Sequence, residues 1–315
     1  MGPALPHALL LIGPPGIGKS ALADRFAQAL LCEAPRPDGD ACGQCAACGW
    51  FEQGNHPDFR LLAPGSDEEG EGKEKDKPSR EIRIAQVRGL AEFLSVGGHR
   101  AGRKVVIVDP AQAMNVPAAN ALLKTLEEPP GQTVFLLVTS RADALPATIR
   151  SRCVCVQLHL PSPEQAIGWL QAQPGIDAGE AAGLLAAAGG APLRARGLAE
   201  PAQAAAYRLI IQTVARLPDN SSIQAAEAVA SVPAKAWLPL LQAWVTDLGR
   251  VAAGAQPRRF PEHRDRLARL AGATSLARLT EYAQWLQRQT GVTEHPLNPR
   301  LFCEDTLSRY RQLFG

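Results

Sequence analysis

Short apolar runs alternate with amphipathic stretches through the first half of the chain. The apolar runs are as long as buried strands and occupy residues 7–13, 59–64, 103–110, 133–140 and 153–160. The amphipathic stretches repeat apolar side chains every three or four positions, as helices do, and occupy residues 19–32, 84–96 and 118–130. Strands that alternate with helices predict an α/β domain with a mainly parallel sheet.

The pattern changes after Pro161-Ser162-Pro163, where Ala- and Leu-rich helical stretches follow one another without a strand signal. A short helical block ends near Gly197, and a longer one starts near Pro201 and runs to Gly315. We therefore expect three domains: an α/β domain over residues 1–160, a small helical domain over 161–200 and an all-α domain over 201–315.

Composition narrows the class of protein. The 315 residues carry a formal net charge of +2 and are 46% apolar, which excludes wholesale disorder and a generic polycation. Apolar runs stay far below the roughly 18 residues of a membrane span, and the uncharged first 18 residues lack the basic start of a signal peptide. We expect a cytoplasmic protein without a membrane partner. The charged residues 65–78 predict a solvated loop, with a docking tail as the alternative.

Four of the seven cysteines lie within 17 positions, spaced C-x₉-C-x₂-C-x₂-C: Cys32, Cys42, Cys45 and Cys48. Without an export signal, this spacing indicates a closed structural Zn²⁺ site that pins a module over residues 32–48. An iron–sulfur cluster or four free thiols are the alternatives. We interpret nearby His56 as a capping or packing residue, and the scattered cysteines as small apolar residues: Cys153, Cys155 and Cys303.

Residues 13–20 fit the P-loop pattern G-x-x-x-x-G-K-[ST] between an apolar strand and a helix. The glycines let backbone N–H groups turn toward phosphate oxygens, and the helix N-terminus adds its dipole. Lys19 is expected to reach the β- and γ-phosphates, and the Ser20 hydroxyl to bind Mg²⁺. The predicted cofactor is thus ATP or ADP with Mg²⁺, cradled by Gly13, Gly16 and Gly18.

Asp109 ends another buried strand, in the position of a carboxylate that holds Mg²⁺ through water. The glutamate that orients the attacking water in hydrolysing P-loop proteins is replaced by Pro110, which can neither orient water nor accept a proton. The sequence therefore predicts nucleotide binding with little hydrolysis. By chemistry alone Arg152 is an ordinary surface residue, and Arg194 could either fold over a nucleotide or simply be solvated.

Together these motifs resemble the clamp-loader branch of the AAA+ ATPases over about residues 5–160. The segments that carry the resemblance are the P-loop, the four cysteines, "GNHPDF", "VVIVDPA", "NALLKTLEEPP", "VFLLVTS" and "SRC". The resemblance implies a RecA-like AAA+ P-loop domain, a small helical lid and an all-α collar that joins five subunits. Such a ring uses ATP to open the sliding clamp and place it on primed DNA during replication.

The resemblance also implies roles for single residues. Arg152, in "SRC", is implied as an arginine finger offered in trans to ATP on a neighbouring subunit. Thr139 or Ser140 is implied at the sensor-1 position, and Arg194 at the sensor-2 position. The chain begins 12 residues before Gly13, which predicts fewer adenine contacts than relatives make.

The pair Asp109-Pro110 separates this chain from the family's motor subunits, gamma and tau, which have Asp-Glu. We therefore expect a stator-like subunit of a DNA polymerase III hetero-pentamer, with gamma or tau and delta as partners. We expect it to hydrolyse almost no ATP alone and to be a component of a DNA-directed DNA polymerase complex, a nucleotidyltransferase. The alternatives are a gamma-type motor ATPase and a zinc-dependent DNA-binding protein.

Overall fold

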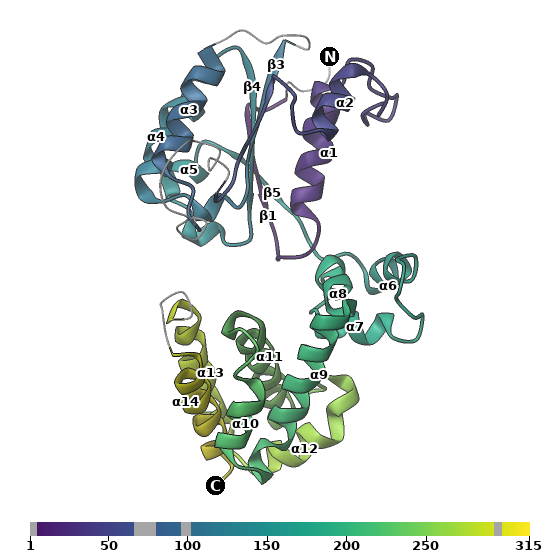
Figure 1. Cartoon of the computed structure of the whole chain (residues 1–315), viewed down its shortest axis with the longest axis vertical. Coiled ribbons are helices and arrows are strands. Elements are labelled where there is room, and N and C mark those ends of the chain that lie inside the picture. Colours follow the sequence, from purple (N-terminus) through teal and green to yellow (C-terminus); the bar gives the residue numbers. More distant parts are fainter. Residues whose placement is uncertain (1–4, 66–79, 96–101, 293–297) are drawn as a thin grey trace. The chain divides into compact units, whose positions relative to one another are not determined.

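The structure is a computed structural model that describes residues 5–65, 80–95, 102–292 and 298–315 (Figure 1). The chain divides into two compact units, Met1–Leu160 and Pro161–Gly315. Most of the predicted charged loop, residues 65–78, falls outside the described residues. Among the residues that are described, no helix is both long and apolar enough to cross a membrane.

The first unit is built on a five-stranded sheet in which every strand pair is parallel. The strand order is β2-β3-β4-β1-β5, from strands β1 (Ala8–Ile12), β2 (Phe59–Leu62), β3 (Arg103–Val108), β4 (Gln132–Thr139) and β5 (Val154–Gln157). The mainly parallel α/β sheet predicted from the sequence is confirmed. Its central strands β3 and β4 are almost wholly buried because helices cover both faces of the sheet.

Helices α1 (Lys19–Leu31) and α2 (Ala46–Glu52) lie on one side of the sheet in Figure 1, and α3 (Ile84–Ser95), α4 (Val116–Glu127) and α5 (Ala147–Arg150) lie on the other. Strand β3 shows how one strand serves both layers. Val105 and Ile107 belong to the core under α1, whereas Val106 and Val108 belong to the core under α3 and α4. This alternation is the two-residue period of a strand.

The ends of α4 are fixed by local chemistry. The Asn115 side chain accepts a hydrogen bond from the Ala118 N–H at 3.0 Å, which caps the first turn. The helix stops at Glu127, just before Pro129 and Pro130, because proline cannot continue a helix. Its buried face holds four small or branched apolar side chains: Ala118, Ala119, Leu122 and Leu126.

The second unit is all-helical, as predicted. A small apolar cluster joins its first helices, α6 (Pro163–Gln171), α7 (Ala181–Ala187) and α8 (Pro192–Ala199). A larger cluster joins α9 (Pro201–Arg216), α10 (Ser222–Val229), α11 (Ala234–Ala252), α12 (Arg264–Gly272), α13 (Leu276–Val292) and α14 (Pro299–Arg311). The boundary near residue 200 between a lid and a collar remains a prediction.

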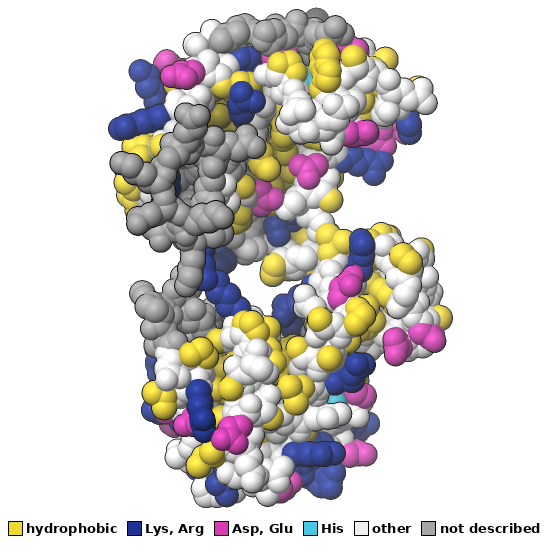
Figure 2. All heavy atoms as spheres, in the orientation of Figure 1, with side chains coloured by type: hydrophobic (Ala, Val, Ile, Leu, Met, Phe, Trp, Pro, Cys, Tyr) yellow, Lys and Arg dark blue, Asp and Glu magenta, His cyan; other side chains and the backbone are white. Residues whose placement is uncertain are grey.

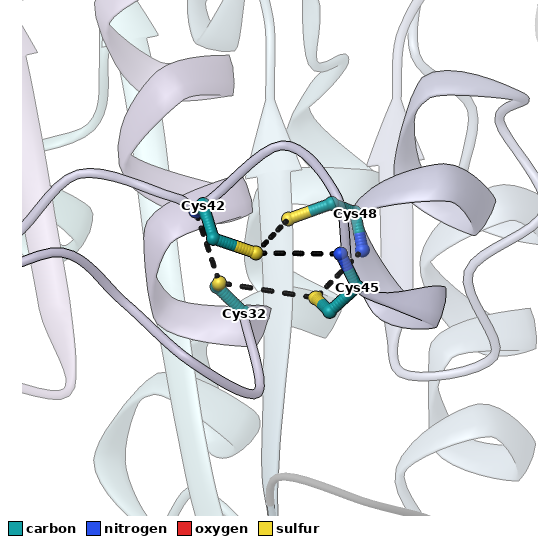
Figure 3. Close-up of side chains that lie close together, drawn as sticks. All are labelled: Cys32, Cys42, Cys45 and Cys48. Carbon is teal, nitrogen blue, oxygen red and sulfur yellow. Dashed lines mark hydrogen bonds between the residues drawn. The ribbon is translucent and has the colours of Figure 1, made fainter.

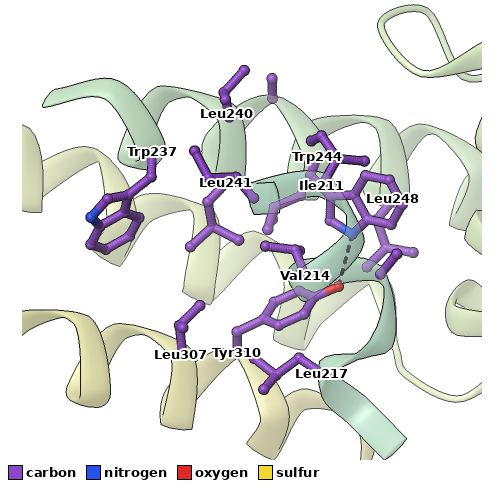
Figure 4. Close-up of a cluster of buried hydrophobic side chains, with 14 of the residues drawn as sticks. Ile211, Val214, Leu217, Trp237, Leu240, Leu241, Trp244, Leu248, Leu307 and Tyr310 are labelled. Carbon is purple, nitrogen blue, oxygen red and sulfur yellow. Dashed lines mark hydrogen bonds between the residues drawn. The ribbon is translucent and has the colours of Figure 1, made fainter. Parts of the chain in front are cut away.

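The larger cluster contains a buried polar pair among its apolar side chains (Figure 4). The Trp244 Nε1–H donates a hydrogen bond to the Tyr310 hydroxyl at 2.8 Å, and both residues are fully buried. The bond joins α11 to α14 across 66 positions of sequence. It satisfies the polar atoms of two large aromatic side chains that the core could not otherwise bury without a penalty.

Candidate functional site

The P-loop, Gly13–Ser20, joins the carboxyl end of β1 to the first residues of α1. Gly16 and Gly18 have φ angles of 80° and 99°, in the left-handed region that other residues rarely adopt. Gly18 is the N-cap of α1 and has no side chain to satisfy the amides of the first turn. Those amides and the helix dipole can therefore bind an anion.

Gly13 is required for a different reason, since backbone passes too close to it for any side chain. A Cβ at this position would lie 2.6 Å from the Leu158 carbonyl oxygen and 2.8 Å from an Ile17 methyl group. The Gly13 N–H donates to the Thr139 carbonyl oxygen at 3.3 Å. The loop thus begins where β1 is held between β4 and the end of β5.

Lys19 is folded back into the loop and is only 7% exposed. Its Nζ donates a hydrogen bond to the Pro14 carbonyl oxygen at 2.8 Å. Burial lowers the pKa of Lys19, and the negative charge of Asp109 acts in the opposite direction. The predicted phosphate-binding lysine and the predicted Mg²⁺ carboxylate are therefore close enough for their charges to interact.

Asp24 is a further carboxylate near these two, and the sequence analysis did not identify it. Burial raises the pKa of Asp24, and the charge of Asp109 raises it further. Asp24 follows Ser20 by four residues, so the two side chains lie one turn apart on α1. That spacing was visible in the sequence.

Thr139 and Ser140, the candidates for sensor 1, lie at the carboxyl end of β4: Thr139 is its last residue and Ser140 follows it, next to the loop after β3. The Thr139 hydroxyl donates to the Gln112 Oε1 at 2.7 Å, and the Gln112 Nε2 donates to the Ser140 Oγ at 3.3 Å. Gln112, another residue missed from sequence, thereby links both candidates to the segment after Asp109. P-loop, Asp109 and Thr139 all follow neighbouring parallel strands, which brings them to one edge of the sheet.

Arg152 lies just after α5, in the sequence Ser151-Arg152-Cys153, and its side chain is 32% exposed. Its guanidinium binds Glu127, the last residue of α4: Nε donates to the Glu127 Oε1 at 2.6 Å, and a terminal nitrogen contacts the same oxygen. The other terminal nitrogen donates to the Thr148 carbonyl oxygen at 2.9 Å and the Ser151 Oγ at 3.4 Å. The guanidinium is held by its own chain.

Arg194 lies on α8 in the second unit and is half-buried. It lines a cavity of about 350 Å³ together with residues of α9 and α11. Its charge is near that of Arg259, whose pKa is lowered by burial and then by Arg194. The sensor-2 role of Arg194 remains a prediction.

The four clustered cysteines converge on one point, and their sulfur atoms all lie within 4.8 Å of one another (Figure 3). The Sγ atoms of Cys32 and Cys45 are 3.9 Å apart, as are those of Cys42 and Cys48. A tetrahedral Zn²⁺ with Zn–S bonds of about 2.3 Å requires edges of about 3.8 Å. The sulfur positions therefore fit zinc.

Backbone amides also point at these sulfurs. The N–H groups of Gln44 and Cys45 donate to the Cys42 Sγ at 3.4 and 3.3 Å and lower the pKa of Cys42 to about 6. Burial acts oppositely on Cys48 and raises its pKa to about 12. Amide donors of this kind orient and stabilise metal-bound thiolates.

The cysteine module is attached to the P-loop helix. Cys32 is the C-cap of α1, and Cys45 is the N-cap of α2. Arg25 of α1 forms an ion pair with Asp40 of the module, with Nε donating to Oδ1 at 2.9 Å. His56 lies outside the sulfur group: it is buried, its Nδ1 accepts from the Asp58 N–H at 3.1 Å, and its ring meets Trp50 edge-on.

A P-loop at the carboxyl edge of a parallel sheet of order β2-β3-β4-β1-β5 defines the first unit as a P-loop domain of the AAA+ class. The profile of the family described as "DNA polymerase III, delta subunit" matches residues 3–162. The chain belongs to the DNA polymerase III delta-prime subunit family.

Individual relatives show how far the similarity extends. The chain is 38% identical to the DNA polymerase III subunit delta' of Pseudomonas aeruginosa, over 98% of this chain and 93% of that protein. It is 39% identical to the delta' subunit of Escherichia coli over 52% of this chain, which is 46% of that relative. A solved gamma subunit-related protein of Thermotoga maritima aligns at 21% identity with a TM-score of 0.47, covering 98% of this chain and 96% of that one.

Proposed function

We propose that this chain is the stator-like subunit of a clamp loader and offers Arg152 in trans to ATP bound on a neighbouring motor subunit. The proposal rests on membership of the delta-prime family combined with Pro110 beside Asp109. A chain that lacks the water-orienting residue contributes to hydrolysis through its neighbour's site. A trans arginine stabilises charge on the transferring phosphoryl group and contributes about 10³–10⁵ to the rate at that site.

The chain's own P-loop is proposed to bind ATP or ADP with Mg²⁺ and to hydrolyse it hardly at all. The left-handed Gly16 and Gly18 and the amides of the first α1 turn supply the phosphate cradle. Lys19 supplies a cation, and Ser20 and Asp109 supply oxygen ligands for Mg²⁺. Thr139 or Ser140, held by Gln112, is proposed as sensor 1.

The proposed partners are gamma or tau and delta in a hetero-pentameric ring, with the sliding clamp and primed DNA engaged by the whole complex. The second unit supplies the proposed lid and collar over residues 161–200 and 201–315. On the face shown in Figure 2, its basic and acidic side chains are interspersed. That distribution favours protein partners over a DNA-binding surface.

The cysteine module is proposed to hold one structural Zn²⁺ through Cys32, Cys42, Cys45 and Cys48. Four thiolates close the tetrahedron, so the metal has no open position for a substrate. Zinc would fix the segment between α1 and α2, which is otherwise attached through a few polar contacts and the buried residues Ala47 and Cys48.

Reconstitution with gamma, delta, sliding clamp and primed DNA tests the proposal. Arg152→Ala is expected to remove the turnover of the ATP site beside this chain. Arg150→Ala, which changes the exposed last residue of the short helix before Arg152, is expected to leave that turnover unchanged. The purified chain alone is expected to hydrolyse almost no ATP. Wild-type turnover in the Arg152→Ala complex would refute the trans role, and substantial turnover by the isolated chain, abolished by Lys19→Ala, would favour a motor ATPase.

A further inference from the structure

The two motifs that most clearly distinguish this chain, "NALLKTLEEPP" and "SRC", meet through a single charge pair. Glu127 comes from the first motif and Arg152 from the second, and they are 25 positions apart in sequence. The Arg152 Nε and one terminal nitrogen both donate to the same carboxylate oxygen of Glu127. The pair therefore fixes the plane of the guanidinium as well as its position.

The remaining donors of Arg152 are almost fully used inside the chain. One terminal nitrogen contacts the Thr148 carbonyl oxygen and the Ser151 hydroxyl. A guanidinium has five N–H groups, so the four contacts leave about one for a further acceptor. Thr148 and Ser151 belong to the short helix α5 and its C-cap, so Glu127 is the anchor that comes from another element.

Glu127 is itself well fixed. It is the last residue of α4, whose other face is buried against the sheet through Ala118, Leu122 and Leu126. The next residue closes the helix, with the Glu128 N–H donating to the Lys124 carbonyl oxygen at 3.1 Å. The carboxylate therefore sits on a rigid support, whereas an unanchored arginine side chain samples many rotamers and loses about 2 kcal/mol of rotamer entropy when ordered.

We propose that Glu127 is a positioning residue for Arg152, holding its guanidinium ready for the phosphate of a neighbouring subunit. This inference rests on the proposed function of Arg152. Glu127 and Arg152 side chains are 48% and 32% exposed, and exposed pairs contribute only about 0.2–1 kcal/mol. Because the pair is weak, the guanidinium can shift from the position that Glu127 sets toward a nearby phosphate, which is a stronger acceptor, without a large cost. The charge pair orders Arg152 and still allows it to engage.

The test uses the reconstituted complex and five forms of this chain: wild type, Glu127→Gln, Arg152→Ala, the double variant and a control. Glutamine keeps the shape of glutamate and removes its charge. Glu127→Gln is expected to lower the ATPase kcat of the site beside this chain by about 2- to 5-fold, the effect of losing one exposed ion pair. The KM for ATP is expected to stay unchanged, because a finger acts in the transition state. Glu128→Gln is the matched control, as its carboxylate is the exposed neighbour in the same motif.

The double variant separates positioning from a general structural effect. In the Arg152→Ala background, Glu127→Gln is expected to cause no further loss, because the residue it positions is absent. Complex assembly and the melting temperature of the chain are expected to match wild type closely. Unchanged kcat for Glu127→Gln, a rise in kcat, or an equal loss in both backgrounds would each overturn the inference. If Arg152→Ala itself has no effect, the proposed function fails rather than the role of Glu127.

Discussion

The cysteine module makes the sharpest test of how local structure depends on a metal. The perturbation is Cys45→Ser, which removes one of the four proposed sulfur ligands but preserves the N-cap of α2, since the serine hydroxyl can accept from the Cys48 N–H as the Cys45 Sγ does at 3.5 Å. Structural zinc sites contribute about 10–16 kcal/mol of apparent binding free energy. The exposed Arg25–Asp40 pair supplies only about 0.2–1 kcal/mol. The proposed zinc would therefore stabilise the module far more than this ion pair does.

The consequence of losing the metal is expected to be local. Cys32 and Cys48 are buried at the module, but the sheet cores are formed by β1, β3 and β4 with α1, α3 and α4. Cys45→Ser is thus expected to release zinc and unfold residues 33–55 while the sheet stays folded. Acid is expected to release zinc from the wild type as well, because protons compete with the metal for the thiolates.

Three measurements check this expectation. Metal analysis should find one zinc per wild-type chain and none in Cys45→Ser. Limited digestion with a protease of broad specificity should cut the variant between α1 and α2, and far-ultraviolet circular dichroism should change only slightly. Cys155→Ser is the matched control, since that exposed thiol lies outside the cluster. One zinc retained by Cys45→Ser, or loss of the sheet signal with the metal, would refute the reasoning.

Three further predictions concern single buried positions. Gly13→Ala places a Cβ 2.6 Å from the Leu158 carbonyl oxygen. It is expected to lower the free energy of unfolding, measured in urea, by about 1–3 kcal/mol and to abolish nucleotide binding. A variant as stable as the wild type that still binds nucleotide would contradict this reasoning. Tyr310→Phe leaves the buried Trp244 N–H unpaired and is expected to cost about 1–3 kcal/mol in thermal unfolding. Burial lowers the pKa of His56, so as the pH falls the unfolded chain takes up a proton at this residue before the folded chain does. The free energy of unfolding is therefore expected to fall as the pH drops below about 6.5, by at most about 1.4 kcal/mol per pH unit. His56→Phe is expected to reduce the change of the urea midpoint between pH 7 and pH 5. The same change in the variant as in the wild type would show that His56 does not cause the pH dependence.

Much of the first unit was predictable from hydrophobic pattern because its strands are buried on both faces. All five apolar runs became strands, with ends that differ from the prediction by a few residues, and the three amphipathic stretches became α1, α3 and α4. Helices α2 and α5 were missed. They contain 7 and 4 residues, too few to show a helical period, and α2 starts at a cysteine whose position depends on the sulfur cluster.

The site was predictable to the extent that its residues follow neighbouring strands. Gly13, Asp109 and Thr139 each come after a buried apolar run, and the carboxyl ends of parallel strands share one edge of the sheet. The polar partners were not predictable in this way. Gln112 meets Thr139 across 27 positions, and Glu127 meets Arg152 across 25, without any periodic signal in the sequence. The first pair is set by the contact between the segment after β3 and the end of β4, and the second by the packing of α4 against α5, so both become visible only in three dimensions.

The P-loop of this chain can be stable without a bound phosphate. Lys19 is largely buried, yet its ammonium is satisfied by the Pro14 carbonyl oxygen and lies within the field of Asp109. A buried cation with a hydrogen bond and a nearby carboxylate is stable without phosphate. The loop can therefore keep its shape in a subunit that does not hydrolyse ATP. Pro110 stands in place of the glutamate that would orient the attacking water for hydrolysis. The Lys19 ammonium has three N–H donors and Pro14 accepts from one of them, so a bound nucleotide can accept from Lys19 as well, in a hydrogen bond whose donor and acceptor are both charged. Retention of the whole motif beside Pro110 is thus physically consistent with the proposal that this chain binds and keeps a nucleotide and offers Arg152 to a neighbouring subunit where turnover would take place.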